Sequence, residues 1–442
     1  MNKKPKVGYL TFGRDDFGYG MALCLSELDQ CELYRVTPKT ARLVDWLCFS
    51  CFWWEHIYIL ADFLRSAGIN KKDDRRPRII VGGFNTANPV PFLAYADYVI
   101  VGDGEGTLKA IIQDGNYDAS NILTSENRTV KYGAAELRSF CHETNDIARI
   151  EIARGCKAKC KFCAVTHLKP YRELAIDKIK EALKTTKMKR VSFFAPEPTM
   201  HSADLEISSA CHALGKTRVD SDVRLDRLSL RSDSVPRVGI EGLSERLRKS
   251  IKKPYSNEVI IEAIRTAIKE GRKGIFMYLI LDLPGEEIAD WEEFSGLCRK
   301  IGELPGAANF VLKPSPSVFL PTPHTPMEYC GIHWDRDYGE QWKKFFGRGD
   351  EREWEVIMAE RSRVFSPHMR LLSMVSTRAG IEFSEIERLA SFNKAIAISG
   401  GRLIVPQKRL LEKIIEKFGG IEKYCGDIEQ GPWKICKLSS KK

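Results

Sequence analysis

The chain has 442 residues, of which 43% are hydrophobic and 29% charged, and its 69 Lys and Arg against 59 Asp and Glu give a net charge of +10. This length exceeds what one hydrophobic core usually organises, so we expect two or three domains. No run of about eighteen apolar residues occurs and no signal-peptide core precedes the first apolar run, so we expect no membrane span and a cytoplasmic protein. The thirteen cysteines are an odd number in a long chain, which favours reduced thiols, some of them metal ligands, over a disulfide framework.

The positive charge has two readings. It is compatible with an anionic partner such as tRNA, DNA or a phosphorylated substrate. Much of it belongs to Lys and Arg spread along expected helices, however, which is typical of a solvated basic surface.

Residues 1–115 alternate short apolar runs with helix-like stretches, a pattern typical of a doubly wound parallel sheet. Gly82-Gly83 and the run from Gly102 to Gly106 each follow an expected strand without forming a GxGxxG fingerprint, so we interpret them as turns rather than phosphate loops. The polar, irregular stretch 116–145 is predicted to be a linker. We expect strands at residues 7–12, 33–36, 44–49, 78–81 and 98–101, and a helix at 55–67.

The alternation resumes in residues 146–328 and predicts repeated β-α units, although periodicity alone does not separate a partial barrel from a flat sheet. Residues 329–442 are predicted to be mainly helical, ending in a basic amphipathic stretch at 406–418 and a Lys-rich tail. In the central region we expect strands at 148–153, 190–194, 222–225, 237–240, 275–281 and 310–312, and helices at 176–185, 205–214 and 256–270.

Three cysteines, Cys156, Cys160 and Cys163, lie within eight residues directly after a buried-type strand. Zinc usually takes four ligands in two separated pairs, whereas a cuboidal iron-sulfur cluster can take three thiolates and leave its fourth iron open. The alternative to metal binding is that the three cysteines are buried and pack as small hydrophobic residues; the lysines between them disfavour it. We expect the flanking cations to offset the charge of a thiolate-ligated cluster and to lower the cysteine pKa values; these cations are Arg154, Lys157, Lys159 and Lys161.

The pattern Cys-x3-Cys-x-Phe-Cys after the first strand of a β-α barrel resembles the radical S-adenosylmethionine (radical SAM) superfamily. The resemblance extends along the central region and is similar to the subgroup that joins a cobalamin-binding-like domain to a radical SAM barrel, related to the methylthiotransferases. It implies an α/β fold with an N-terminal Rossmann-like sheet, a partial (β/α)6 barrel and a helical C-terminal extension. The matching segments, in order, are Arg224-Leu-Asp226, Gly239-Ile-Glu241, Pro284-Gly285-Glu286 and Pro321-Thr-Pro323-His324.

This resemblance implies a four-iron four-sulfur (4Fe-4S) cluster on Cys156, Cys160 and Cys163, with SAM chelating the open iron. One electron, delivered by a reductant of the flavodoxin or ferredoxin type, would split SAM into methionine and a 5'-deoxyadenosyl radical. Residues acting on the substrate stay unassigned. By position, the residues expected to contact SAM are Phe162, Glu197, Arg224 and Glu241.

For two of these residues, Glu241 and Arg224, an ordinary ion pair is the alternative to a SAM contact. Glu241 could accept hydrogen bonds from the ribose hydroxyls or form a salt bridge with a nearby Arg. Arg224 could face the SAM carboxylate or pair with Asp226 or Glu241. Glu197 follows Phe-Ala-Pro, where many relatives carry a glycine-rich turn that meets the SAM amino group.

The N-terminal region looks like a cobalamin-binding-type domain. Many such domains ligate cobalt with a histidine in an Asp-x-His-x-x-Gly loop, but residues 13–20 contain none, which leaves open either bound cobalamin or a scaffold domain. Cys48 and Cys51 would suit a second cluster, yet they lie in an apolar run, so burial is favoured. His324, between prolines, is expected to fix its loop rather than to bind metal.

The sequence thus predicts a radical SAM enzyme acting on an unidentified substrate. Methyl or methylthio transfer and nucleic-acid base modification are both compatible with the resemblance, the latter through the basic stretch around Lys408, Arg409 and Lys413. The alternative from another class is a non-catalytic zinc protein that binds nucleic acid.

Overall fold

A computed structural model describes most of the chain. The described residues are 3–11, 18–70, 73–83, 88–127, 129–144, 146–220, 222–230, 235–253, 255–346, 366–378, 389–390, 393, 405–417, 419–429 and 436–437. Contacts divide the chain into two compact units. Unit 1 comprises residues 1–136, 322–324 and 368–442, and unit 2 comprises residues 137–321 and 325–367. No helix among the described residues is both long and apolar enough to cross a membrane.

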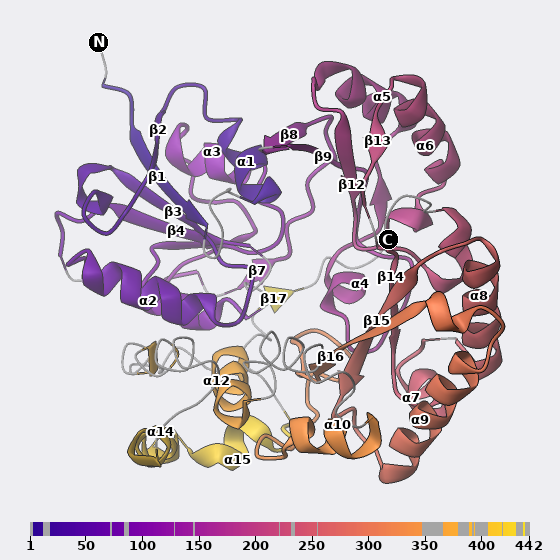
Figure 1. Ribbon diagram of the computed structural model, residues 1–442. Coiled ribbons are helices and arrows are strands. Elements are labelled where there is room, and N and C mark those ends of the chain that lie inside the picture. The colour runs from indigo at the N-terminus through magenta and orange to yellow at the C-terminus, as the bar shows by residue number, and fades with distance from the viewer. Residues whose placement is uncertain are drawn as a thin grey trace. The chain divides into compact units, whose positions relative to one another are not determined.

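Unit 1 is built on a six-stranded sheet in the order β2-β1-β3-β4-β5-β6 (Figure 1). The first five strands are parallel, and β6 is antiparallel to β5. The sheet strands are β1 (Lys6–Thr11), β2 (Glu32–Arg35), β3 (Trp46–Ser50), β4 (Arg78–Gly82), β5 (Tyr98–Ile100) and β6 (Ile122–Leu123). A separate pair joins β7 (Val130–Lys131) to β17 (Cys436–Lys437). The helices are α1 (Tyr19–Leu25), α2 (His56–Ser66), α3 (Thr107–Ile112), α12 (Pro367–Arg378), α14 (Val405–Lys417) and α15 (Gly420–Cys425).

The central strand β3 shows why this sheet is doubly wound. Trp46 and Cys48 join a buried cluster with residues of α1 and α3. Phe49 points to the other face, where its ring lies 5.4 Å from that of Phe63 on α2. Since successive residues of a strand point to opposite faces, an almost wholly apolar strand requires helices on both. The sequence prediction of a Rossmann-like parallel sheet is confirmed.

Helix α12 belongs to the same unit as the N-terminal sheet. The Tyr58 hydroxyl on α2 donates to the Leu372 carbonyl at 2.9 Å, and the Asn88 amide donates to the Thr377 carbonyl at 2.8 Å. The predicted helical C-terminal region is therefore present, and α12 packs against the N-terminal domain. Helix α14 covers most of the predicted basic stretch, whereas Phe418 and the Lys-rich tail lie outside the described residues.

Unit 2 carries the repeated β-α units. Its parallel strands are β9 (Ile147–Glu151), β12 (Arg190–Phe194), β13 (Thr217–Arg218), β14 (Arg237–Glu241), β15 (Gly274–Leu281) and β16 (Val311–Val318). They form two sheets, β13-β12-β9-β8 and β14-β15-β16. An isolated parallel bridge also joins Asp222, which follows β13, to Arg237 at the start of β14. This arrangement is the predicted partial (β/α)6 barrel.

The remaining elements of unit 2 surround these strands. In Figure 1, α5 and α6 cover one sheet while α8 and α9 cover the other. Helix α8 begins where the Ser256 hydroxyl accepts a hydrogen bond from the Val259 N–H at 3.3 Å, and it buries Ile260, Ile264 and Ala267 at helical spacing. The bounds are β8 (Cys141–Thr144), β10 (Ala153–Arg154), α4 (Ala164–Leu168), β11 (Arg172–Glu173), α5 (Ile176–Thr185), α6 (Asp204–Ala213), α7 (Glu245–Ser250), α8 (Asn257–Lys269), α9 (Ile288–Gly302) and α10 (Tyr338–Phe346).

The structure differs from the sequence prediction in two places. The strand expected at residues 222–225 is only the Asp222 bridge, and a 3-10 helix, Leu225–Leu230, begins at its end. Residues 116–145, expected as a linker, contain β6, β7 and β8, of which β6 and β8 join the main sheets. The division into four domains at 115, 145 and 328 stays a prediction.

Candidate cluster and cofactor site

The cysteine loop begins at Gly155, directly after β10. Gly155 has φ 79°, and a Cβ there would lie 2.6 Å from the carbonyl oxygen of Pro170 and 2.8 Å from that of Lys169. Only glycine tolerates both the left-handed backbone and this close approach. The Thr166 hydroxyl then donates to the Cys156 carbonyl at 3.2 Å, so the start of the loop is fixed before the first cysteine side chain.

The three thiols lie in one partly buried environment. Cys160 is 6% exposed, and Cys156 and Cys163 are half-buried. The backbone N–H of Ala158 hydrogen-bonds the Cys156 thiol, and those of Val165 and Thr166 hydrogen-bond the Cys163 thiol. Such donors stabilise a thiolate.

The donor set can be tested against a single metal ion. Among the described residues, no three His, Cys, Asp or Glu side chains converge as one metal ion requires. The three thiols nevertheless interact electrostatically with one another. A cuboidal cluster can take three thiolates, each on a different iron, whereas a structural zinc site usually has four ligands, so the three thiols match the number that a cluster needs.

The expected effect of the flanking cations is wrong. Burial raises the pKa of all three thiols, that of Cys160 to about 11. Arg154 is engaged by Glu151 at 2.6 Å, and the Lys157 ammonium lies 2.9 Å from a carboxylate oxygen of Glu173. Arg154 and Lys157 are thus paired with carboxylates. A bound metal, which takes cysteine as the thiolate, would displace the thiol protons.

Two carboxylates lie at or just beyond the carboxyl ends of two strands of the barrel, β12 and β14. Glu197 follows β12, where its side chain accepts hydrogen bonds from the hydroxyl and the N–H of Thr199 at 2.6 and 3.3 Å. Glu241 ends β14 with φ 67°, a left-handed conformation that non-glycine residues rarely adopt. Burial raises the pKa of both carboxyl groups. Half-buried carboxylates at the carboxyl ends of parallel strands, one of them on a strained backbone, are typical of a ligand site.

Sequence reasoning missed Lys253, which lies among these groups. Its ammonium is 3.6 Å from a carboxylate oxygen of Glu241 and donates to the Gly239 carbonyl at 2.9 Å. Its side chain is 19% exposed, and it interacts electrostatically with Cys160 and Glu197. The expected salt bridge of Glu241 is therefore present, but its partner is a lysine.

The other predicted SAM contacts are placed less specifically. Arg224 pairs with Asp226 through contacts of 2.8 and 3.2 Å while still acting electrostatically on Glu197. Phe162 is half-buried between the second and third cysteines. The structure therefore brings Glu197, Glu241 and the cysteines close enough to interact electrostatically. Arg224 forms its alternative ion pair, with Asp226.

A second polar cluster follows β15. Asp282, which has φ 64° and is 4% exposed, accepts hydrogen bonds from the backbone N–H of His333 at 3.0 Å and lies 2.7 Å from Nδ1 of the same residue. Glu286 accepts the Trp291 indole N–H at 2.9 Å, and burial raises its pKa to about 7. The Pro284-Gly285-Glu286 motif therefore marks an exposed turn that holds a half-buried carboxylate next to the buried Asp282.

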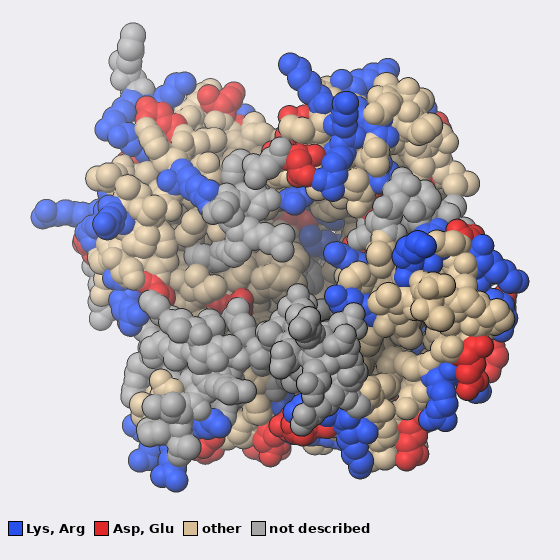
Figure 2. All heavy atoms as spheres, in the orientation of Figure 1, with Lys and Arg blue, Asp and Glu red and all other residues tan. Residues whose placement is uncertain are grey.

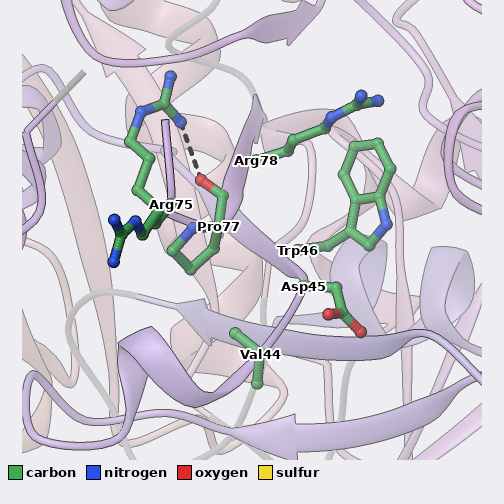
Figure 3. A pocket seen from close by; sticks show the side chains of 7 residues that line it. Val44, Asp45, Trp46, Arg75, Pro77 and Arg78 are labelled. Atoms are coloured by element: carbon green, nitrogen blue, oxygen red, sulfur yellow. Dashed lines mark hydrogen bonds between the residues drawn. The ribbon is translucent and has the colours of Figure 1, made fainter. Parts of the chain in front are cut away.

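The remaining sequence candidates lie in unit 1. Cys48 and Cys51 are 2% and 0% exposed, as burial predicts, and burial raises their pKa values. His324 has φ 64°. Figure 3 shows a shallow pocket beside Trp46 and Arg78, which begin β3 and β4. Because doubly wound sheets bind ligands at the carboxyl ends of their strands, this pocket at the amino ends is not a cofactor site of that kind.

Comparisons with known proteins agree with this geometry. Residues 150–298 match the radical SAM superfamily. An uncharacterised protein of Methanocaldococcus jannaschii, MJ0966, is 28% identical over 189 residues, which are 40% of this chain and 42% of that protein. The chain thus matches less than half the length of this curated relative.

Solved structures of the cobalamin-dependent SAM radical enzyme OxsB share the fold. The apo, selenomethionine-labelled form gives a TM-score of 0.56 at 13% identity, covering 97% of this chain and 82% of that one. The form with aqua-cobalamin and SAM bound gives 0.51 at 12% identity, covering 98% and 78%. The family match spans the cysteine loop, Glu197 and Glu241 and ends within α9. Residues 150–298 of this chain are therefore a radical SAM domain.

Proposed function

We propose that this chain is a radical SAM enzyme in which Cys156, Cys160 and Cys163 hold a 4Fe-4S cluster. The observation that carries the proposal is the gathering of these thiols with Glu197, Glu241 and Lys253 at the carboxyl ends of the barrel strands. The number of thiols, three rather than four, supports a cluster rather than zinc, and the backbone hydrogen bonds to Cys156 and Cys163 would stabilise its thiolates.

The protein's own residues would bind and orient the cofactor. Glu241 is suited to accept hydrogen bonds from the ribose hydroxyls, and Glu197, held by Thr199, to accept them from the SAM amino group. Phe162 would shield the cluster beside its last ligand, and Arg224 would have to leave Asp226 to face the SAM carboxylate. When bound, the reduced cluster supplies the electron that splits SAM into methionine and a 5'-deoxyadenosyl radical.

Metal analysis tests the cluster assignment. Anaerobic reconstitution of the parent should give about four irons and four sulfides per chain. The variant Cys156→Ala/Cys160→Ala/Cys163→Ala should bind neither. Cys141→Ala, which removes a half-buried thiol of the same unit, should bind as the parent does. Zinc without sulfide in the parent would instead support the alternative of a zinc protein that binds nucleic acid.

Cobalamin is a second cofactor to test on unit 1. OxsB binds it, and the present chain shares the fold. Phe52 and Trp53 begin two residues after the end of β3; they are 51% and 58% exposed, and their rings pack edge to face at 4.8 Å. An exposed aromatic pair near the carboxyl end of a parallel sheet offers apolar surface against which part of a large cofactor such as cobalamin could pack. We expect the parent to retain hydroxocobalamin on desalting, as its absorption spectrum would show, and the Phe52→Ala/Trp53→Ala variant to lose it. If the parent retains no hydroxocobalamin, unit 1 would be better explained as a scaffold domain.

The substrate class is the finer part of the proposal. Methyl or methylthio transfer fits bound cobalamin or a donor sulfur, and base modification fits the net charge of +10. Figure 2 shows Lys and Arg spread over the face in view with Asp and Glu among them. Binding to RNA that weakens steeply between about 50 and 200 mM salt would favour base modification. Salt-independent or absent binding would favour a small-molecule or peptide substrate.

A further inference from the structure

Lys253 has no counterpart among the residues that the cysteine pattern or the strand-end motifs predict. It follows α7 in a tight turn in which Lys252 has φ 60°. The backbone N–H of Lys161, between the second and third cysteines, donates to the carbonyl of Ile251 at 3.0 Å. This bond ties the cluster loop to the turn two residues before Lys253.

The ammonium group of Lys253 is directed to the carboxyl end of β14. A Cβ on Gly239 would lie 3.1 Å from the Lys253 Nζ and 2.3 Å from a carboxylate oxygen of Glu241. The missing side chain at Gly239 thus makes the space in which the two charges meet. Lys253 interacts electrostatically with all three cysteines and with Glu197.

The pairing with Glu241 does not remove the influence of this charge on the thiols. Lys253 Nζ lies 3.6 Å from a carboxylate oxygen of Glu241 and donates a hydrogen bond to the Gly239 carbonyl, which carries no net charge. Beside this pairing, Lys253 still acts electrostatically on Cys160. Of the side chains that flank the cysteines, Arg154 and Lys157 are bound to acidic partners. Lys253 comes from a different segment of the chain and acts electrostatically on all three thiols.

We propose that Lys253 sets the charge balance of the iron-sulfur site and makes the bound cluster easier to reduce. The inference rests on the proposed function and goes beyond it, because it assigns a positioning residue outside the cysteine loop and the SAM contacts. A fixed positive charge in a partly buried site favours the state of the cluster that carries one more electron. Removing the charge while keeping the length of the side chain should therefore lower the reduction potential.

The test is a redox titration of the reconstituted, SAM-free protein followed by electron paramagnetic resonance. Lys253→Met should make one-electron reduction about tenfold less favourable, a fall of ~59 mV. Lys253→Arg keeps the charge and should restore the parent potential. The matched control is Lys252→Met, which removes an exposed charge one residue away and should leave the potential near that of the parent.

The outcomes separate this inference from the proposed function. A parent protein that binds no iron and sulfide would contradict the proposed function itself. A parent cluster whose potential is unchanged in Lys253→Met, or lowered equally in Lys252→Met, would overturn the role of Lys253 while leaving the cluster assignment intact. If Lys253→Met fails to fold, a Lys253→Gln variant that folds and keeps the parent potential would overturn it equally.

Discussion

Glycines follow strands in both units, but different groups fill the space beside them. In unit 1, a Cβ on Gly102, after β5, would lie 2.5 Å from backbone atoms of Gly133, and one on Gly83, after β4, would lie 2.7 Å from the Cys51 carbonyl. In unit 2, a Cβ on Gly239 in β14 would meet the charged ends of Glu241 and Lys253. A glycine near a strand end indicates a site only where reactive side chains fill its space; elsewhere it permits two backbones to pack.

The largest expected effect is on stability, and it concerns a glycine of unit 1 that is crowded by neighbouring backbone. Gly102→Ala should lower the free energy of unfolding by about 4 kcal/mol, because it adds strain at φ 91° to a clash with backbone that cannot move aside. The control is Gly115→Ala at φ 63°, where nothing lies within 4 Å and strain alone should cost about 1 kcal/mol. Urea unfolding measures both, and equal losses would contradict the role of crowding.

A second prediction concerns Glu286, in the turn after β15, and the pH dependence of stability. The folded-state pKa of Glu286, about 7 against an ordinary 4.5, means that the folded protein keeps a proton the unfolded chain has lost. The free energy of unfolding should therefore fall as pH rises from about 4.5 to 7, by about 3 kcal/mol in total.

The variant Glu286→Gln should remove this fall, because it stays uncharged, and should be more stable than the parent at pH 8. Denaturant titrations at pH 5 and pH 8 measure the difference. The exposed Glu292→Gln is the control and should keep the parent profile. A parent and a Glu286→Gln variant with parallel profiles would rule out the buried neutral carboxyl.

The smallest change in free energy is expected at Gly239. Gly239→Ala should displace the flexible ends of Glu241 and Lys253 and leave the backbone in place, so stability should change by about 1 kcal/mol or less. SAM binding to the reconstituted protein should weaken about tenfold, ~1.4 kcal/mol. Gly296→Ala on α9, with open space around it, is the control. The affinity for SAM is measured by equilibrium binding. An unchanged affinity in Gly239→Ala would show that the Glu241–Lys253 pair does not shape the SAM site.

Local patterns made the strands and the cysteine loop predictable. The loop needs only its spacing and a preceding strand, and β12 and α5 match their predicted bounds because apolar residues recur at the periods of strand and helix. The strand expected at 222–225 failed because its charged Arg224-Leu-Asp226 sequence turns into a 3-10 helix, whose residues make local side-chain bonds. The two-residue strands β6 and β7 are too short to show any period.

Contacts between distant residues were not predictable. The neutralisation of Lys157 depends on Glu173, sixteen residues away, and the position of Lys253 depends on a backbone bond from Lys161 to Ile251. A lysine beside a proline carries no periodic or motif signal, so only the folded barrel identifies it. Glu241 was predicted by its motif, whereas its left-handed backbone and its partner were not.

Reductive cleavage of SAM tests the central claim most directly. The reconstituted parent, given dithionite and SAM under anaerobic conditions, should form 5'-deoxyadenosine and methionine, measured by liquid chromatography and mass spectrometry. The triple Cys156→Ala/Cys160→Ala/Cys163→Ala variant should form neither, and Cys141→Ala should match the parent. A parent that binds four irons and four sulfides yet forms no 5'-deoxyadenosine, or a triple variant that cleaves SAM as the parent does, would contradict the account.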